Sequence, residues 1–285
     1  MTFLEFVTQH ETSIRLGCFV GTFLLIALWE GASPRRPLAI SKIMRWVNNL
    51  SLTLLSSVVL RMVFPAAAVG MASFAQAHGW GLLHPFSLPF WLTLVVSIVV
   101  MDFVIYLQHR LFHVVPLLWR LHSVHHADLD YDVTTGSRFH PFEILLSMMI
   151  KMAAIAALGP PVVAVVFFEV LLNGTAMFNH GNVRIPLNID RFLRWIMVTP
   201  DMHRVHHSID TTEMNRNFGF NFPCWDRLLG TYQDQPAVTH EAMTLGIPHH
   251  SDPKIVVYFT GLLLLPFKNR LVNENTNETN GGTAE

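Results

Sequence analysis

The chain has 285 residues, of which 51% are apolar and only 14% are charged. An ordinary soluble domain carries about 25% charged residues, so this composition excludes a typical soluble protein and indicates an integral-membrane protein. With a formal net charge of −1, a nucleic-acid partner is not expected. Cys18 and Cys224 are too few, and lie in settings too different, for a disulfide framework.

Three apolar stretches in the first part of the chain predict membrane-spanning helices. They cover residues 16–29, 50–73 and 85–107, and each approaches or exceeds the roughly 20 residues that a helix needs to cross a bilayer. The first is not expected to be a cleaved signal peptide, because Glu5 and Glu11 stand where such a peptide carries basic residues.

A fourth apolar region, residues 143–178, is interrupted by Gly159, Pro160 and Pro161. A double proline breaks a helix, so the region predicts a helical hairpin that enters the membrane and returns, with either half marginal as a full span.

Basic residues accumulate on the cytoplasmic side of short loops; here they gather between the first two spans, whereas residues 74–84 carry no charge. This asymmetry places the N-terminus and the 74–84 loop outside and the histidine-rich segments in the cytoplasm.

Eight of the sixteen histidines fall in three short motifs. The motifs are QHRLFH with His109 and His113, HSVHH with His122, His125 and His126, and HRVHH with His203, His206 and His207. Helical residues three or four positions apart share a face, and neutral imidazole suits iron, zinc and copper. The motifs therefore predict a metal cage on helices, and Thr199 with Pro200 supplies an N-cap and first-turn proline for the third helix.

The number of imidazoles favours two metal ions over a hydrolytic zinc site, which usually has three protein ligands and a carboxylate base. The motifs contain no glutamate, and Glu143 and Glu169 lie far from them in sequence. A metal transporter would place its ligands near the membrane midplane, whereas these motifs follow the spans in polar sequence. An iron pair held by nitrogen at a membrane suits O2-dependent oxidation of an unactivated C–H bond in a lipid. A membrane zinc hydrolase and a metal transporter are the alternatives.

The order of the motifs resembles the fatty acid hydroxylase superfamily, or sterol desaturase family, of integral-membrane diiron enzymes. Between about residues 90 and 232, HxxxH is followed by HxxHH, RFHPFE, FNHGN, and HRVHH with NFGFNFPCWDRLLGTY. The resemblance implies an all-α membrane bundle, about three spans plus a helical hairpin, with a cytosolic histidine-rich helical cap that holds a dimetal site. It also implies two iron ions, O2 as cosubstrate, a lipid substrate and an external electron donor of the cytochrome b5 or ferredoxin type. Zinc can replace iron in purified protein, because zinc ranks above ferrous iron in affinity for imidazole ligands.

Matching these motifs assigns metal-ligand roles, and catalytic roles through the metals, to nine histidines: His109, His113, His122, His125, His126, His180, His203, His206 and His207. Many relatives have a further histidine four residues before His180, where this chain has Ala176. Hydrogen-bond partners that orient the ligands are predicted to come from His140, Asp102, Asn182, Asn217 and Asp226. A structural role fits His140 as well as ligation does, and helix packing is the alternative for Asp102.

The predicted organisation has four parts. Residues 1–107 hold the N-terminal transmembrane spans, and residues 108–250 form the histidine-rich catalytic region, including the membrane hairpin 143–178. Residues 251–268 form an apolar interfacial segment, and residues 269–285, rich in Asn, Thr, Glu and Gly, form a disordered tail. The histidines outside the motifs are expected to be solvated or structural: His10, His78, His84, His240, His249 and His250.

Overall fold

The computed structural model describes residues 1–268, so the predicted tail at 269–285 lies outside the described residues. Within residues 1–268 the chain is all-helical, and its only β-type pairings are three isolated bridges. The bundle contains α1 (Phe3–Gln9), α2 (Glu11–Ala32), α3 (Lys42–Val63), α4 (Ala67–His78), α5 (Phe90–Val114), α7 (Pro141–Leu158) and α8 (Val162–Asn179). The remaining elements are α6 (Pro116–His126), η1 (Thr135–Ser137), α9 (Leu187–Leu193), α10 (Pro200–His206), α11 (Thr211–Met214), α12 (Cys224–Leu228), α13 (Pro253–Val256), α14 (Phe259–Leu264) and η2 (Leu265–Phe267).

Five segments of the described chain are long and apolar enough to cross a membrane. They are Glu11–Ala32, Lys42–His78, Phe90–Val114, Pro141–Leu158 and Val162–Asn179. The second predicted span, residues 50–73, lies within the candidate span Lys42–His78, but this span is divided: α3 ends at Val63 and α4 begins at Ala67, on either side of Pro65. Proline cannot continue a helical hydrogen-bond ladder. The prediction of a helical hairpin is confirmed: α7 ends at Leu158, its C-cap Gly159 has a φ of 70°, and each arm is 18 residues long.

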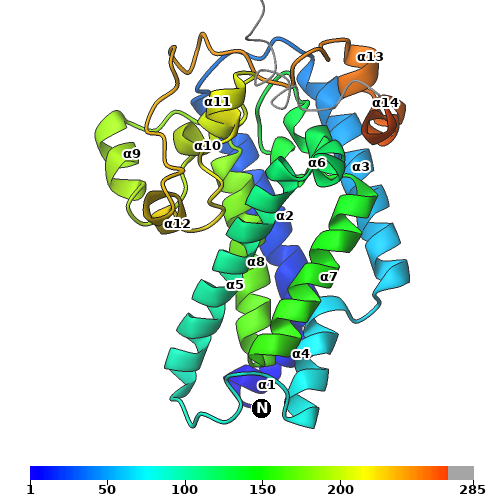
Figure 1. Ribbon diagram of the computed structural model, residues 1–285, viewed down its shortest axis with the longest axis vertical. Coiled ribbons are helices and arrows are strands. Elements are labelled where there is room, and N and C mark those ends of the chain that lie inside the picture. The colour runs from blue at the N-terminus through cyan, green and yellow to red at the C-terminus, as the bar shows by residue number, and fades with distance from the viewer. Residues whose placement is uncertain (269–285) are drawn as a thin grey trace, which may run out of the picture.

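The two ends of the bundle differ in content (Figure 1). The N-terminus, α1 and α4 lie at one end, together with the α7–α8 turn, whose Ala157 and Leu158 carbonyls accept hydrogen bonds from Leu82 and Leu83. The short helices α6, α10, α11, α13 and α14 gather at the opposite end. All of the histidine motifs therefore lie at one end of the bundle, and the 74–84 loop lies at the other.

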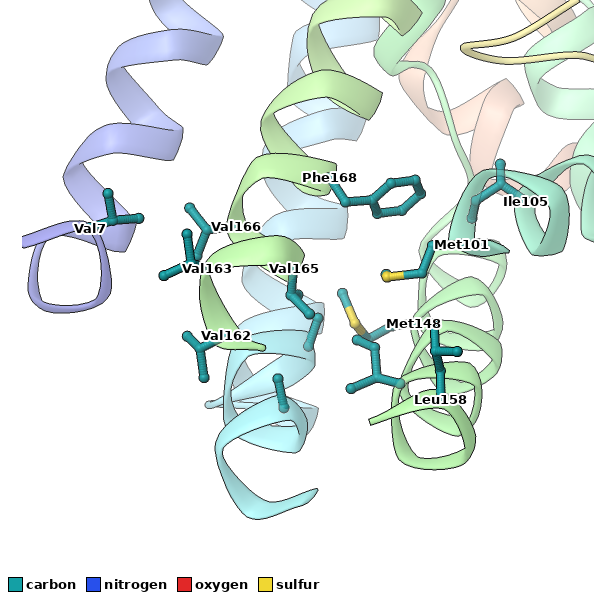
Figure 2. Close-up of a cluster of buried hydrophobic side chains, with 13 residues drawn as sticks. Val7, Met101, Ile105, Met148, Leu158, Val162, Val163, Val165, Val166 and Phe168 are labelled. Carbon is teal, nitrogen blue, oxygen red and sulfur yellow. The ribbon is translucent and has the colours of Figure 1, made fainter. Parts of the chain in front are cut away.

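Helix α8 is the centre of the bundle (Figure 2). Its Val162, Val163 and Val166 face Val7 of α1, whereas its Phe168 points toward Met101 of α5. In a bilayer, helices associate through close van der Waals packing and polar contacts rather than through the hydrophobic effect. The buried, compact side chains of α8 allow that close packing, so α8 carries His180 to a fixed position at the end of its last turn.

A buried ion cluster fixes the histidine-rich end of the molecule to α3. The fully buried guanidinium of Arg45 pairs with Asp132 and, at 2.7 Å, with Asp128. Arg138 contacts Asp128 at 3.4 Å and donates to the Val124 carbonyl of α6 at 2.8 Å. Buried charges are tolerated only when they are paired and hydrogen-bonded, so this cluster defines how α6 sits on the bundle.

The segment after residue 250 also packs on this end of the bundle. Val256, Val257, Leu262 and Leu265 are fully buried in one apolar cluster with residues of α3 and α6. The segment therefore packs against both α3 and α6.

Candidate metal centre

The nine histidines singled out from the sequence come together in two groups at one end of the bundle. The first group contains His109, His113, His122, His126 and His206, and the second contains His125, His180, His203 and His207. Within each group the candidate ligand atoms lie within 4.8 Å of one another, and every member is buried. His125 and His126 are neighbours in sequence but belong to different groups, because consecutive residues of a helix point in different directions.

In the first group, two ring nitrogens face each other without a proton between them. The Nδ1 atoms of His109 and His206 lie 2.8 Å and 2.7 Å from the carbonyl oxygens of Phe218 and Arg216. A carbonyl oxygen only accepts, so each Nδ1 carries the proton and each Nε2 of the neutral ring presents a lone pair. These two Nε2 atoms are 2.9 Å apart, a separation close to the roughly 3 Å between neighbouring donors on one metal ion with bonds of about 2.1 Å.

The second group has the same arrangement around His180. Its Nδ1 donates to the Ala176 carbonyl at 2.7 Å, which leaves the Nε2 lone pair facing Nε2 of His125 at 3.1 Å and Nε2 of His207 at 3.2 Å. The approach of η1 to α8 at this point depends on Gly136, since a Cβ at residue 136 would lie 2.6 Å from the Ala176 oxygen.

The imidazoles are held in the neutral form that binds metals. Burial lowers the pKa of His122 and of His180 to about 3. Burial, reinforced by neighbouring imidazoles, also holds the pKa values of His126, His206 and His207 well below the usual range. Metal ligation requires an unprotonated nitrogen, and these rings supply it at neutral pH.

Several nitrogens of the cage lack a protein partner among the described residues. They include Nε2 of His113, Nε2 of His122 and both ring nitrogens of His126. Buried polar atoms are nearly always hydrogen-bonded, so unpartnered ring nitrogens gathered in one place fit a site that holds a cation. The donor set is entirely imidazole, which suits iron, zinc and copper, and the residues therefore fit a pair of such ions.

The groups that orient the ligands differ from those predicted from the sequence. Besides the carbonyls of Arg216, Phe218 and Ala176, the orienting partner is Glu143, whose Oε1 lies 2.7 Å from Nδ1 of His122. Backbone carbonyls carry no sequence signature. Glu143 lies 21 residues from His122, so only the return of α7 onto α6 reveals the contact.

Of the predicted orienting residues, Asp102 and Asp226 hold the backbone near the ligands. Asp102 accepts hydrogen bonds from Nδ2 of Asn221 and Nε1 of Trp225, each at 2.7 Å. These contacts join α5 to the 221–225 segment, as the alternative role of Asp102 in helix packing predicts. Asp226 accepts from the backbone amides of Phe218 and Gly219, each at 2.8 Å. Since the Phe218 carbonyl orients His109, Asp226 acts on the cage through the backbone.

The side chains of the other predicted partners bond to backbone groups instead of to a ligand ring. The Asn182 side chain accepts from the Arg36 amide and donates to its carbonyl, which joins the loop after α2 to the end of α8. The Asn217 amide donates to the Met202 and Gln233 carbonyls. His140 lies outside both groups and caps α7, with its Nδ1 accepting from the Phe142 amide at 3.2 Å.

The remaining histidines also lie outside both groups. His10, His78, His84 and His249 are exposed, whereas His240 and His250 are buried elsewhere in the histidine-rich end. As predicted, Thr199 caps α10 by accepting from the Met202 amide at 3.3 Å. Both cysteines are free.

A cavity of about 550 Å³ adjoins the first histidine group and extends into the bundle. His109, His122, Glu143 and Ala176 line it near the cage. Of these, Ala176 also contacts the second group, because its carbonyl oxygen accepts from His180. A long apolar molecule that enters from the bundle would meet the cage at its end.

Comparisons with known proteins agree with this geometry. The family model of fatty acid hydroxylases matches residues 94–231, which include all nine histidines. Ornithine lipid hydroxylase OlsE of Rhizobium tropici is 29% identical over 230 residues, which cover 76% of this chain and 66% of that protein.

Two eukaryotic relatives extend the comparison. Alkylglycerol monooxygenase of Xenopus tropicalis is 27% identical over 212 residues, or 70% of this chain and 44% of that protein. Methylsterol monooxygenase 2-2 of Arabidopsis thaliana is 28% identical over 165 residues, or 56% and 61% of the two chains. The matched region thus spans about two thirds or less of these relatives. No solved structure matches the chain.

Proposed function

Because the chain belongs to the fatty acid hydroxylase superfamily, we propose that it is an O2-dependent diiron oxidoreductase that hydroxylates or desaturates an unactivated C–H bond of a membrane lipid. A sterol, a fatty acyl chain and a related lipid all fit this description. The observation that carries the proposal is the pair of buried, all-imidazole groups that adjoins a cavity inside a membrane bundle.

The two histidine groups would each hold one iron ion, which when bound supplies the chemistry that activates O2. The residues of the chain have three tasks around it. The nine imidazoles provide neutral donors, the carbonyls of Arg216, Phe218 and Ala176 with Glu143 fix the ring orientations, and the buried setting excludes water. Fixed ring orientation matters because loss of a group that hydrogen-bonds a ligand imidazole typically reduces metal affinity or activity by about 10–100-fold.

The cavity would position the substrate. Its walls near the cage combine Phe112, Phe139 and Met177 with the ligands His109 and His122. An unactivated C–H bond offers no polar group for recognition, so only the shape of the cavity and the anchoring of the rest of the lipid can select the carbon that reacts. Electrons would come from an external donor of the cytochrome b5 or ferredoxin type at the histidine-rich end, which we propose faces the cytoplasm.

The proposal is tested with protein purified from iron-supplied cells and membranes incubated with isotopically labelled O2. We expect close to two metal ions per chain, iron in the active protein, and a lipid product that has gained one labelled oxygen atom or lost two hydrogen atoms. Zinc can occupy the groups after overexpression, because it ranks above ferrous iron in affinity for such donors. A product whose added oxygen comes from water would instead support hydrolysis.

The matched variants for this test are His206→Ala and His249→Ala. His206 is buried in the first group, whereas His249 is exposed and lies outside both. We expect the first variant to lose turnover and metal and the second to keep both. Equal loss of turnover and metal in the two variants would contradict the assignment of the ligands.

A further inference from the structure

The cavity beside the metal centre continues to a set of charged side chains at its other end. Arg15 of α2, Arg61 of α3, Lys151 of α7 and Glu169 of α8 all line it. Charged residues are rare inside membrane-spanning helices and mark binding sites or ion pathways there. None of these four residues contributes to the histidine groups, so the proposed metal chemistry leaves them without a role.

These charges lie well away from the cage. Lys151 follows Glu143, the partner of His122, by eight residues on α7, and Glu169 precedes His180 by eleven residues on α8. At 1.5 Å per helical residue, these separations are about 12 Å and about 16 Å along the helix axes. The wall between the two ends is mostly apolar and includes Leu60, Ile105, Met148 and Leu172, together with the hydrogen-bonded pair Gln108 and Ser147.

The charges do not balance within the protein. Glu169, with only 3% of its side chain exposed, lies 2.9 Å from Nζ of Lys151 and 3.2 Å from Arg15. Arg15 also pairs with Glu11 at 2.9 Å. Arg61 has no acidic partner within residues 1–268. Three cations therefore meet two carboxylates, and the surplus positive charge favours an anion from outside.

The same end of the cavity is open toward the membrane. Leu16 of α2 is 62% exposed, and Ser57 and Arg61 of α3 are also exposed, although all three line the cavity. Helix α2 packs mainly on α8, and α3 packs mainly on α7. The opening therefore lies between α2 and α3, within segments that are apolar enough to span the bilayer.

We propose that Arg15, Arg61 and Lys151 hold the anionic group of a lipid, a carboxylate or a phosphate, that enters sideways between α2 and α3. The chain of this lipid runs along the apolar wall toward the metal centre. Arg and Lys are the side chains that bind carboxylate and phosphate most strongly. The inference rests on the proposed function of the same site. It adds that the reacting carbon is selected by its distance from the anionic group, about 12–16 Å along the bundle.

The test compares two pairs of radiolabelled ligands with matched chains on the purified full-length protein. Palmitate is compared with hexadecanol, and lysophosphatidate with monoacylglycerol, with inorganic phosphate as a competitor. We expect at least one anionic member to bind about tenfold or more tightly than its neutral partner, equal to about 1.4 kcal/mol. The pair that shows the preference identifies carboxylate or phosphate, and competition by inorganic phosphate shows whether the anion alone suffices.

Variants assign the preference to the charged end. Arg61→Gln should reduce the preference to within about twofold while hexadecanol or monoacylglycerol binds as before, and Lys151→Gln should reduce it in part. Arg191→Gln removes an exposed cation of α9 outside the cavity and should change nothing. No preference in the wild type, equal weakening of anionic and neutral ligands in Arg61→Gln, or the same loss in Arg191→Gln would overturn the inference.

Metal content and labelled-oxygen uptake, measured on the same preparations, separate this inference from the proposed function. Anion preference without metal or turnover would refute the diiron activity alone, and turnover without anion preference would refute the lipid anchor alone. Loss of metal in both Arg61→Gln and Lys151→Gln would mean that the charges stabilise the bundle, and would overturn the anchor.

Discussion

Replacing His180 with alanine should remove one metal ion and leave the other. His180 is one of four imidazoles in the second group, and its Nε2 lies between those of His125 and His207. The variant leaves three donors there, while the five donors of the first group are untouched. Metal content should therefore fall from close to two ions per chain to close to one, with loss of turnover because both ions are required.

Inductively coupled plasma mass spectrometry of the purified variants measures this directly, and His140→Ala is the control. His140 is also buried, but it caps α7 and lies outside both groups. Loss of an N-cap costs about 1 kcal/mol of stability, so this variant should unfold at a lower temperature yet keep both ions. Full metal retention in His180→Ala with loss in His140→Ala would refute the division into two groups.

Three further results are expected. Glu143→Gln should lower turnover or metal affinity by about 10–100-fold, because the side chain that orients a ligand imidazole becomes a poorer acceptor; normal kinetics and metal content would remove its positioning role. Gly136→Ala should lower metal content and the midpoint of thermal unfolding, because the added Cβ would lie 2.6 Å from a carbonyl oxygen of α8. Gly17→Ala is the control: a Cβ at residue 17 has no atom within 4 Å, so neither quantity should change. In a cysteine-free background, an impermeant thiol reagent applied to intact cells should label Ala77→Cys and not Val238→Cys; the reverse would place the metal centre outside.

The sequence was most informative where a local rule decides the structure. The spacing of the histidine motifs determined that helices would present several imidazoles on one face, and Thr199 with Pro200 marked the start of α10. The double proline at 160–161 fixed the hairpin, because neither residue can continue α7. The same rule applied to Pro65 would have divided the second span, which the length of its apolar run concealed.

The division of the nine histidines between two groups required the tertiary structure. His125 and His126 are adjacent, as are His206 and His207, yet the members of each pair belong to different groups. Which imidazoles from α5, α6, α8 and α10 converge depends on how these helices cross, and helix crossing depends on packing that no motif encodes.

What the sequence by itself determined is therefore the membrane class, the helical ligand faces and the identity of the nine histidines. Only the tertiary structure decided which groups hydrogen-bond the ligand imidazoles and which charged side chains meet at the far end of the cavity. Glu143 meets His122 because α7 returns beside α6, and Arg15, Lys151 and Glu169 meet because α2, α7 and α8 pack together. The physical reason is that a contact between residues distant in the chain depends on the free energy of packing whole helices, whereas periodicity and capping depend on a few neighbouring residues.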